Sequence, residues 1–148
     1  MVTNMMKDIK LIEFTPIEDE RGSLISLERS KDIPLNTIKR VYYLYNLAQE
    51  ERRGFHAHRN LEQILVCING KCCISVDDGH IKKDILLDSP TKGLYIGAMI
   101  WREMHGFSPD CVLMVLANQL FDEEDYIRDY KKFSILAKEG VISDNERN

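Results

Sequence analysis

Two histidines separated by one residue, His56 and His58, are the side chains of this sequence best suited to chemistry. Alternate side chains of a β-strand share a face, so both imidazoles would project to one side of a strand while Ala57 turns away. Imidazole is matched to proton transfer because its unperturbed pKa lies at about 6.5, and neutral imidazole is also a common metal ligand. The pair therefore predicts either a proton-transfer site or part of a metal centre.

The residues around this pair separate the two alternatives. His56 and His58, followed by Glu62, resemble the opening half of the metal-binding motif of cupins. A cupin supplies its last metal ligand from a later strand, and Arg102 stands at that place here. A guanidinium is permanently cationic and cannot ligate a metal, while His105 would face the other side of its strand. We therefore expect a site with no metal and no cofactor that acts on an anionic substrate.

Arg102 and Tyr42 are the further candidates for the reaction itself. An inward cation in line with the two histidines can stabilise negative charge that develops on a substrate oxygen. The alternative for Arg102 is an internal salt bridge with Glu62 or Glu103. Of the neighbours Tyr42 and Tyr43, one must face inward if the other faces out, and an inward phenol can hold or shuttle a proton.

Three more side chains are candidates for substrate contacts. Arg40 and Arg53 can clamp phosphate because a guanidinium presents a fixed fork of donors to oxyanions. For either arginine, the alternative is a solvated position on the surface. Gln63 can hydrogen-bond a ligand from its place beside Glu62.

Length and charge exclude several classes of function. The chain of 148 residues fits one domain, predicted to span 1–148, and it carries a net charge of −4. This charge argues against a nucleic-acid binder, which normally presents a basic face. No apolar run approaches the roughly 20 residues that cross a bilayer, and residues 1–10 lack the apolar core of a signal peptide. We therefore expect a cytoplasmic protein with no nucleic-acid and no membrane partner.

The cysteines fit the same compartment. The chain has four of them, Cys67, Cys72, Cys73 and Cys111, and they form no C-x-x-C pair. Zinc binding by Cys72 together with Cys73 is disfavoured because adjacent strand residues point to opposite faces. We expect reduced, half-buried thiols.

Short apolar runs between turn signals predict an all-β domain. Asn69-Gly70 and Asp78-Gly79 are typical of tight hairpin turns. Many short strands at this spacing favour a sandwich or barrel, including the double-sheet jelly roll that cupins use. The expected strands are Ile9–Phe14, Leu24–Leu27, Ile38–Tyr45, Gln63–Ile68, Cys72–Val76, Ile81–Leu87, Gly93–Ile96 and Cys111–Ala117.

The C-terminal part of the chain has a different pattern. Within Asp122–Lys138, the aromatic residues Tyr126, Tyr130 and Phe133 are spaced by four and three positions. This spacing predicts one or two short amphipathic helices that lie on the barrel. Residues 134–148 would form a peripheral tail.

A series of sequence blocks extends over nearly the whole chain, from about Lys10 to Phe133. The blocks are Arg21–Leu24, Ile38–Tyr43, Arg53–His58, Leu61–Val66, Gly93–Gly97, Trp101–Met104 and Asp125–Arg128. Together and in this order they resemble the dTDP-sugar 3,4-ketoisomerases of the cupin superfamily. The resemblance implies a metal-independent cupin double-stranded β-helix and a homodimer that exchanges N-terminal strands.

The resemblance also implies an activity. The substrate would be dTDP-4-keto-6-deoxyglucose, whose carbonyl would move from C4 to C3 through an enediol or enediolate. His56 would remove the C3 proton, which the C4 carbonyl acidifies, while His58 would orient His56 or help relay the proton. Tyr42 would contact the sugar, and Arg102 would offset the enediolate charge. The product would supply a PLP-dependent sugar aminotransferase that makes a 3-amino-3,6-dideoxyhexose for lipopolysaccharide or another surface glycan.

The remaining candidates concern substrate contacts and product configuration. Arg40, Arg53 and Gln63 would contact the diphosphate and the nucleotide, with Arg21 as a further substrate contact. Members of the family differ at Arg102 (histidine or arginine) and at Arg21 (arginine or tyrosine), in correlation with the configuration at C4. Arg102 is the gluco (quinovose) signature and Arg21 the galacto (fucose) signature. We expect the gluco-configured product because position 102 should lie closer to the reacting carbons.

Three other functions suit the same scaffold. A 3,5-epimerase would share the base but exchange protons at C3 and C5 instead of moving the carbonyl. A non-catalytic nucleotide-sugar-binding cupin would keep its ligand affinity without His56. A metallocupin would hold a tight, stoichiometric metal ion.

Overall fold

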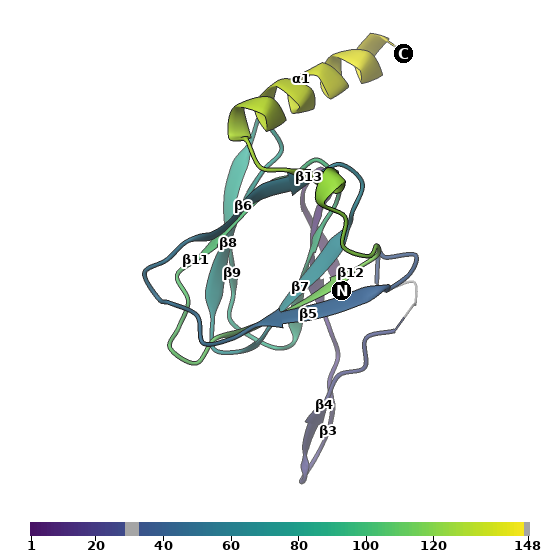
Figure 1. Ribbon diagram of the computed structural model, residues 1–148. Coiled ribbons are helices and arrows are strands. Elements are labelled where there is room, and N and C mark those ends of the chain that lie inside the picture. The colour runs from purple at the N-terminus through teal and green to yellow at the C-terminus, as the bar shows by residue number, and fades with distance from the viewer. Residues whose placement is uncertain (29–32, 147–148) are drawn as a thin grey trace.

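The computed structural model describes residues 1–28 and 33–146, and its main body is a barrel of two antiparallel sheets (Figure 1). The six-stranded sheet has the order β1 (Val2–Met6), β2 (Ile9–Glu13), β10 (Lys92–Ile96), β7 (Gln63–Asn69), β12 (Val112–Ala117) and β5 (Arg40–Leu44). The five-stranded sheet has the order β13 (Tyr126–Ile127), β6 (Arg53–His58), β11 (Trp101–His105), β8 (Cys72–Asp77) and β9 (Lys82–Leu87). The predicted all-β jelly roll is confirmed.

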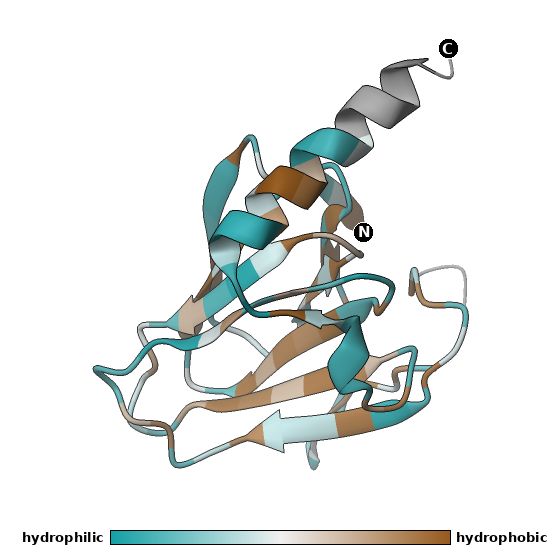
Figure 2. Ribbon diagram, turned by 45° about the horizontal axis from the view of Figure 1, so that its top comes forward, coloured by the Kyte–Doolittle hydropathy of each residue, from teal (hydrophilic) through white to brown (hydrophobic). Residues whose placement is uncertain are grey.

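Alternation along the strands explains why the two sheets face each other. On β8, Ile74 and Val76 are buried between the sheets, while Cys73 and Ser75 face outward and are half-buried. The inward side chains of both sheets form one apolar core, and Figure 2 shows apolar residues along the strands that enclose it. Burial of this core drives the closure of the barrel.

β7 departs from this alternation because both of its faces are covered. Leu65 and Cys67 point into the barrel, whereas Ile64 and Val66 belong to a second apolar cluster on the outer side of the six-stranded sheet. The loop that carries Ile33 and Leu35 covers this outer cluster. Neither residue lies in a strand, so burial of their side chains helps to hold this loop on the sheet.

The predicted strands are largely confirmed, and one of them is wrong. Residues Leu24–Leu27 were expected to form a strand, but β4 spans Gly22–Leu24 and pairs with β3, Ile17–Asp19, in a small hairpin that projects from the barrel (Figure 1). The chain leaves the hairpin after Leu24 because Leu27 packs against the outer apolar cluster instead of continuing a sheet. The strands β1, β3 and β13 have no counterpart in the prediction.

The C-terminal prediction needs correction. Within Asp122–Lys138, the chain forms a 3₁₀ turn, Glu123–Asp125, then β13, and only then a single helix α1, Tyr130–Glu146. Tyr126 pairs with His58 of β6, so this segment extends the five-stranded sheet and cannot be helical. Phe133 of α1 is fully buried against Trp101, which attaches the helix to the barrel. Among the described residues, no helix combines the length and the apolar character needed to span a bilayer.

Candidate active site

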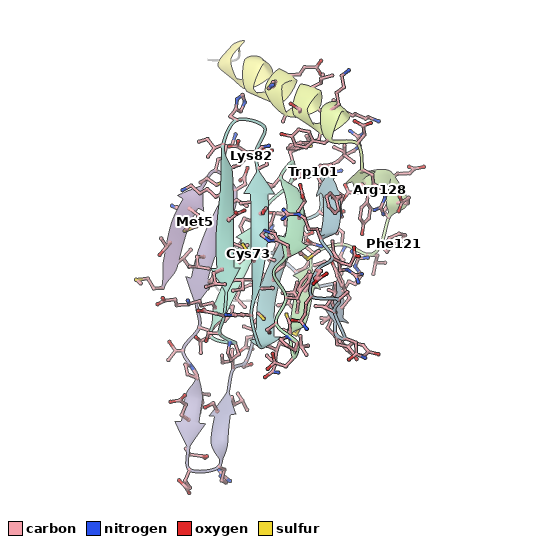
Figure 3. All side chains as sticks on the ribbon, turned by 90° about the vertical axis from the view of Figure 1, so that its left-hand side faces the viewer. Met5, Cys73, Lys82, Trp101, Phe121 and Arg128 are labelled. Atoms are coloured by element: carbon pink, nitrogen blue, oxygen red, sulfur yellow. The ribbon has the colours of Figure 1, made fainter. Side chains whose placement is uncertain are left out.

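A cavity of about 380 Å³ opens between the two sheets and is lined by four of the predicted residues, Arg40, Tyr42, Arg53 and His56. Its walls come from β5, β6 and β11 and from the segment around β13. Figure 3 shows Phe121 and Arg128 of this segment together on one side of the barrel. The lining residues are Arg40, Tyr42, Leu44, Arg53, Gly54, His56, Met104, Phe121, Tyr126 and Arg128. Cationic, aromatic and imidazole groups therefore converge on one chamber.

A β-bulge in β6 determines which side chains reach this chamber. Arg102 of β11 pairs with His56, but the next residue, Glu103, pairs with Gly54, so Phe55 is an extra residue on β6. Gly54 and Phe55 have φ angles of 94° and 55°. A Cβ on Gly54 would lie 2.9 Å from the carbonyl oxygen of Arg102. Arg53 and His56 would point to opposite faces of a regular strand, and the bulge lets both line the cavity.

His56 is held in one tautomer by its own strand. Nδ1 of His56 lies 3.1 Å from the carbonyl oxygen of Gly54, so the ring donates from Nδ1 and keeps its lone pair on Nε2. Burial, and then the positive charge of Arg102, lower the pKa of His56 from 6.5 to about 4. At neutral pH the ring is therefore an uncharged base whose Nε2 accepts protons.

His58 is supported by a carboxylate from the segment that forms β13. Nδ1 of the fully buried His58 donates to Oδ2 of Asp125 at 3.1 Å. The backbone N–H groups of Asn60 and Leu61 also donate to this carboxylate, at 2.8 and 3.2 Å. Burial, followed by the charge of Arg102, holds the pKa of His58 well below its usual range. Asp125 thus fixes a neutral His58 whose Nε2 is an acceptor.

The two imidazoles meet edge to face beneath a tyrosine ring. The ring centroids of His56 and His58 are 4.9 Å apart. Tyr126 covers both rings, at 4.9 Å from His56 and 4.4 Å from His58. This packing restricts the rotation of both rings.

Arg102 is buried inside the barrel with 1% of its surface exposed. Its Nη1 donates to Oε1 of Gln63 at 2.7 Å, and its Nη2 donates to the carbonyl oxygen of Ile100 at 2.9 Å. Nε2 of Gln63 in turn donates to the hydroxyl oxygen of Tyr42 at 2.9 Å. Burial lowers the pKa of Arg102 to about 10 and raises that of Tyr42. Gln63 therefore connects the cation to the phenol, and both ends of its amide are engaged within the protein.

The alternative salt bridges of Arg102 are wrong. Glu62 instead accepts hydrogen bonds from the hydroxyl of Tyr95 and, at 3.0 Å, from Nδ2 of Asn118. Glu103 faces the other side of β11 and pairs with Arg52 at 3.2 Å. The carboxylate of Glu62, which belongs to the cupin-like half motif, is therefore hydrogen-bonded to Tyr95 and Asn118 and not to Arg102.

The predicted arginines divide into two groups. Arg40 lies over the rings of Tyr42 and Phe121, at 5.1 and 5.7 Å, and it lines the cavity together with the exposed Arg53. Arg21 lies far from this group on the β3–β4 hairpin, where its side chain is 84% exposed and pairs with Asp19 at 2.7 Å. The structure therefore brings together all the predicted site residues except Arg21, although the buried His58, Gln63 and Arg102 lie behind the lining.

Four buried side-chain polar atoms have no hydrogen-bond partner in the part of the chain that the structure describes, and all four belong to residues of this site. They are Nε and Nη2 of Arg40, Nε2 of His58 and Nε of Arg102. Buried polar groups are nearly always hydrogen-bonded, so their concentration here indicates a place built for a polar ligand. Three cationic donors favour an anionic or oxygen-rich molecule, and the imidazole offers it one acceptor.

Four residues at the site carry no role predicted from the sequence: Asp125, Tyr126, Phe121 and Arg128. Arg128 is paired with Glu123 at 2.7 Å and lies over the ring of Tyr126 at 4.2 Å. The block Asp125–Arg128 was noted for its resemblance alone, because no local pattern indicates a contact with His58. That contact spans 67 positions of sequence and depends on the pairing of β13 with β6.

Comparisons with known proteins agree with this geometry. The family model described as "FdtA: WxcM-like, C-terminal" matches residues 7–138. A TDP-4-oxo-6-deoxy-alpha-D-glucose-3,4-oxoisomerase from Aneurinibacillus thermoaerophilus is 56% identical over 124 residues, which cover 84% of this chain and 88% of that protein.

Two similar solved structures are also 3,4-ketoisomerases. The enzyme from Helicobacter canadensis is 45% identical with a TM-score of 0.85, and the match covers 88% of this chain and 98% of that one. QdtA from Thermoanaerobacterium thermosaccharolyticum, in complex with TDP, is 43% identical with a TM-score of 0.87, over 91% of this chain and 98% of that one.

Proposed function

Because this chain belongs to the FdtA family and is a TDP-sugar 3,4-ketoisomerase of cupin fold, we propose that it converts TDP-4-keto-6-deoxyglucose into a TDP-3-keto-6-deoxyhexose. The observation that carries this proposal is the neutral His56, which lines the cavity with Nδ1 bound to Gly54 and Nε2 left basic. Arg102 acts on the same ring as a nearby positive charge. Base and cation are the two groups that enolisation beside a carbonyl requires.

In the proposed reaction, Nε2 of His56 takes the proton from C3, and the C–H electrons form a C3=C4 double bond. The former C4 carbonyl oxygen becomes an enediolate oxygen, whose charge Arg102 offsets. Return of a proton to C4 and loss of the C3 hydroxyl proton leave the carbonyl on C3. Tyr42 contacts the sugar, and His58 orients His56 or relays the proton. No atom is gained or lost overall, so the step needs no cofactor.

The cations at the cavity mouth suit the diphosphate of the substrate. Arg40 has two buried donor atoms without a hydrogen-bond partner among the described residues, and Arg53 lines the same cavity. We assign these two arginines to the diphosphate. Gln63 serves a different purpose from the expected nucleotide contact, since its amide positions Arg102 and Tyr42.

A homodimer that exchanges N-terminal strands remains part of the proposal. Val41 and Tyr43 project from β5, with 53% and 65% of their surfaces exposed, and give the six-stranded sheet an apolar outer edge suited to a second copy. Arg21 cannot contact a substrate in its own cavity from the projecting hairpin, so we place it at the cavity of the partner.

Subunit mixing tests this placement of Arg21. R21A and H56N homodimers would both be impaired, but a mixed dimer would contain one site with both native residues. Recovery of activity after mixing supports an Arg21 supplied by the partner. Mixed dimers without recovery, or a monomer by light scattering, would contradict it.

The activity itself is tested by a proton NMR time course of TDP-4-keto-6-deoxyglucose with the protein in D₂O. We expect a 3-keto sugar of gluco configuration, recognised in a parallel reaction in H₂O by a large H4–H5 coupling, because Arg102 lies beside the base. A small coupling would indicate the galacto product and would leave the assignment as a 3,4-ketoisomerase unchanged. Deuterium exchange at C3 or C5 without carbonyl migration would indicate an epimerase, and binding without any change would indicate a non-catalytic protein.

The cellular role follows from the chemistry of the product. A 3-keto sugar nucleotide is the substrate type that a PLP-dependent aminotransferase converts into a 3-amino-3,6-dideoxyhexose. We propose such an enzyme as the next step, in the cytoplasm. Co-incubation with an aminotransferase and an amino donor should yield the amino sugar only when this protein is present.

A further inference from the structure

The outer face of the five-stranded sheet carries a second cluster of reactive side chains, away from the cavity. Cys73 of β8 lies directly opposite His105 of β11. Two residues along β8, Ser75 lies opposite Asp84 of β9. Figure 3 views this face, where Cys73, Lys82 and Trp101 are labelled. Three adjacent strands therefore present a thiol, an imidazole and a carboxylate on one side.

These three groups are close enough to share one ion. The ligand atoms of Cys73, His105 and Asp84 all lie within 4.8 Å of one another. We propose that Cys73, His105 and Asp84 bind a Zn²⁺ ion on the outer face of the sheet. Sulfur, nitrogen and carboxylate oxygen are the donors that Zn²⁺ takes in proteins, and a site with three protein ligands leaves the fourth position open.

Hydrogen bonds already hold the side chains in place. Oγ of Ser75 lies 2.8 Å from Nε2 of His105 and donates to Oδ1 of Asp84 at 2.5 Å. Both side chains are therefore held at Ser75, and because its single hydroxyl proton goes to Asp84, Nε2 of His105 is the donor and must release this proton to ligate an ion. Preorganised ligands lose less side-chain entropy on binding, which favours affinity.

The charge balance and the access also suit a divalent cation. One thiolate, one carboxylate and a neutral imidazole neutralise the two charges of Zn²⁺. Arg52, whose charge acts on the thiol, is already paired with Glu103 at 3.2 Å. An open cavity of about 340 Å³ adjoins Ser75 and Asp84, so an ion and its water ligand can enter from solvent.

The other group of thiols in the described part of the chain is less suited. Cys67, Cys72 and Cys111 also lie within 4.8 Å of one another, but their exposures are 0%, 0% and 2%. An ion there would need three thiolates inside the apolar core, with a net charge left uncompensated. The mixed cluster on the surface has neither disadvantage.

Cobalt and zinc titrations of the reduced, full-length protein test the proposal. We expect one Co²⁺ per chain with a thiolate-to-cobalt charge-transfer band in the near ultraviolet, displaced by one equivalent of Zn²⁺. C73S should abolish the band, and H105N should weaken Zn²⁺ binding by at least about 10–100-fold, the loss that removal of an outer-shell partner alone can cause. H80N changes an exposed histidine outside the cluster and should leave the cobalt band and the Zn²⁺ affinity unchanged.

Two results would overturn the assignment. The first is a band that persists in C73S and disappears in C111S, because that places the ion in the buried group of thiols. The second is equal zinc affinity in the native protein, C73S and H105N. Circular dichroism of the metal-free variants confirms that each is folded, so loss of binding is distinguishable from unfolding.

Discussion

The two faces of β11 both carry polar side chains, but these are in opposite states. On the outer face, Glu103 accepts from Arg52 and from Nε1 of Trp101, and His105 is bound to Ser75. On the inner face, Arg102 is buried, and one of its nitrogen atoms has no hydrogen-bond partner within residues 1–28 and 33–146. The polar groups on the outer face hydrogen-bond to one another beside solvent. The polar groups on the inner face are held in place by the protein, but some of their nitrogen atoms have no hydrogen-bond partner among the described residues.

This difference shows how the fold separates stability from catalysis. A buried, unpaired donor is costly to a protein, and such groups persist where a ligand uses them. Arg102 and His58 both have an unpaired nitrogen, yet each is held by other hydrogen bonds to the protein. The inner face is therefore preorganised for a polar substrate, and each inner residue has an outer counterpart that can serve as its control.

The largest effect is expected from His56→Asn compared with His105→Asn. Loss of the base should reduce kcat by about 10²–10⁴-fold while TDP affinity stays near the native value. H105N should retain native turnover, because its side chain faces the opposite side of the sheet. Steady-state kinetics and calorimetric titration with TDP measure the two quantities. Native turnover in H56N would remove His56 from its role as base.

A somewhat smaller effect is expected from Arg102→Lys compared with Arg52→Lys. Lysine keeps the charge but cannot reproduce the hydrogen bonds to Gln63 and Ile100, so the cation moves relative to the enediolate. We expect kcat to fall by about 10²–10³-fold, the range for loss of an oxyanion-stabilising donor. Equal kinetics for R102K and R52K would show that the buried guanidinium is structural.

Asp125→Asn compared with Asp84→Asn tests the support of His58. An amide can donate to the imidazole and thereby stabilise the wrong tautomer, with the proton on Nε2. We expect kcat to fall on the order of 10²-fold, with KM changed less, and no loss in D84N. If D125N lowered the melting temperature but left kcat intact in folded protein, Asp125 would serve only to anchor the loop at Asn60 and Leu61.

The pH dependence gives the smallest but most specific signal. Because the pKa of His56 is lowered to about 4, the acid limb of kcat/KM should lie near that value and not near 6.5. Between these pH values the unfolded chain binds more protons than the folded one, so stability should decrease as the pH falls from 6.5 toward 4. H56N should lose less stability over this range in urea titrations. An acid limb near 6.5 would show that His56 is solvated in the working enzyme.

Local sequence patterns were sufficient for much of the fold. Alternation and turn residues indicated most strands of the barrel, because a half-buried strand requires one apolar face. The turn at Asp78-Gly79 connects β8 to β9 in a hairpin, as expected. The turn at Asn69-Gly70 closes no hairpin, because it carries the chain from β7 of the six-stranded sheet to β8 of the five-stranded sheet. The segment around Tyr126 was assigned to a helix because aromatic spacing carries no information about pairing with a distant strand.

For the active site, the sequence by itself determined which reactive side chains are present. They are two histidines on one strand face, an arginine where a metal ligand would stand, and a tyrosine facing inward. Tertiary structure decided the state of these groups. The bulge at Phe55, the carboxylate of Asp125 behind His58 and the burial that keeps His56 neutral all depend on contacts between separate strands. Residue types fix which protons and charges are available, but only the packed barrel sets their solvation, and solvation sets the pKa values that catalysis needs.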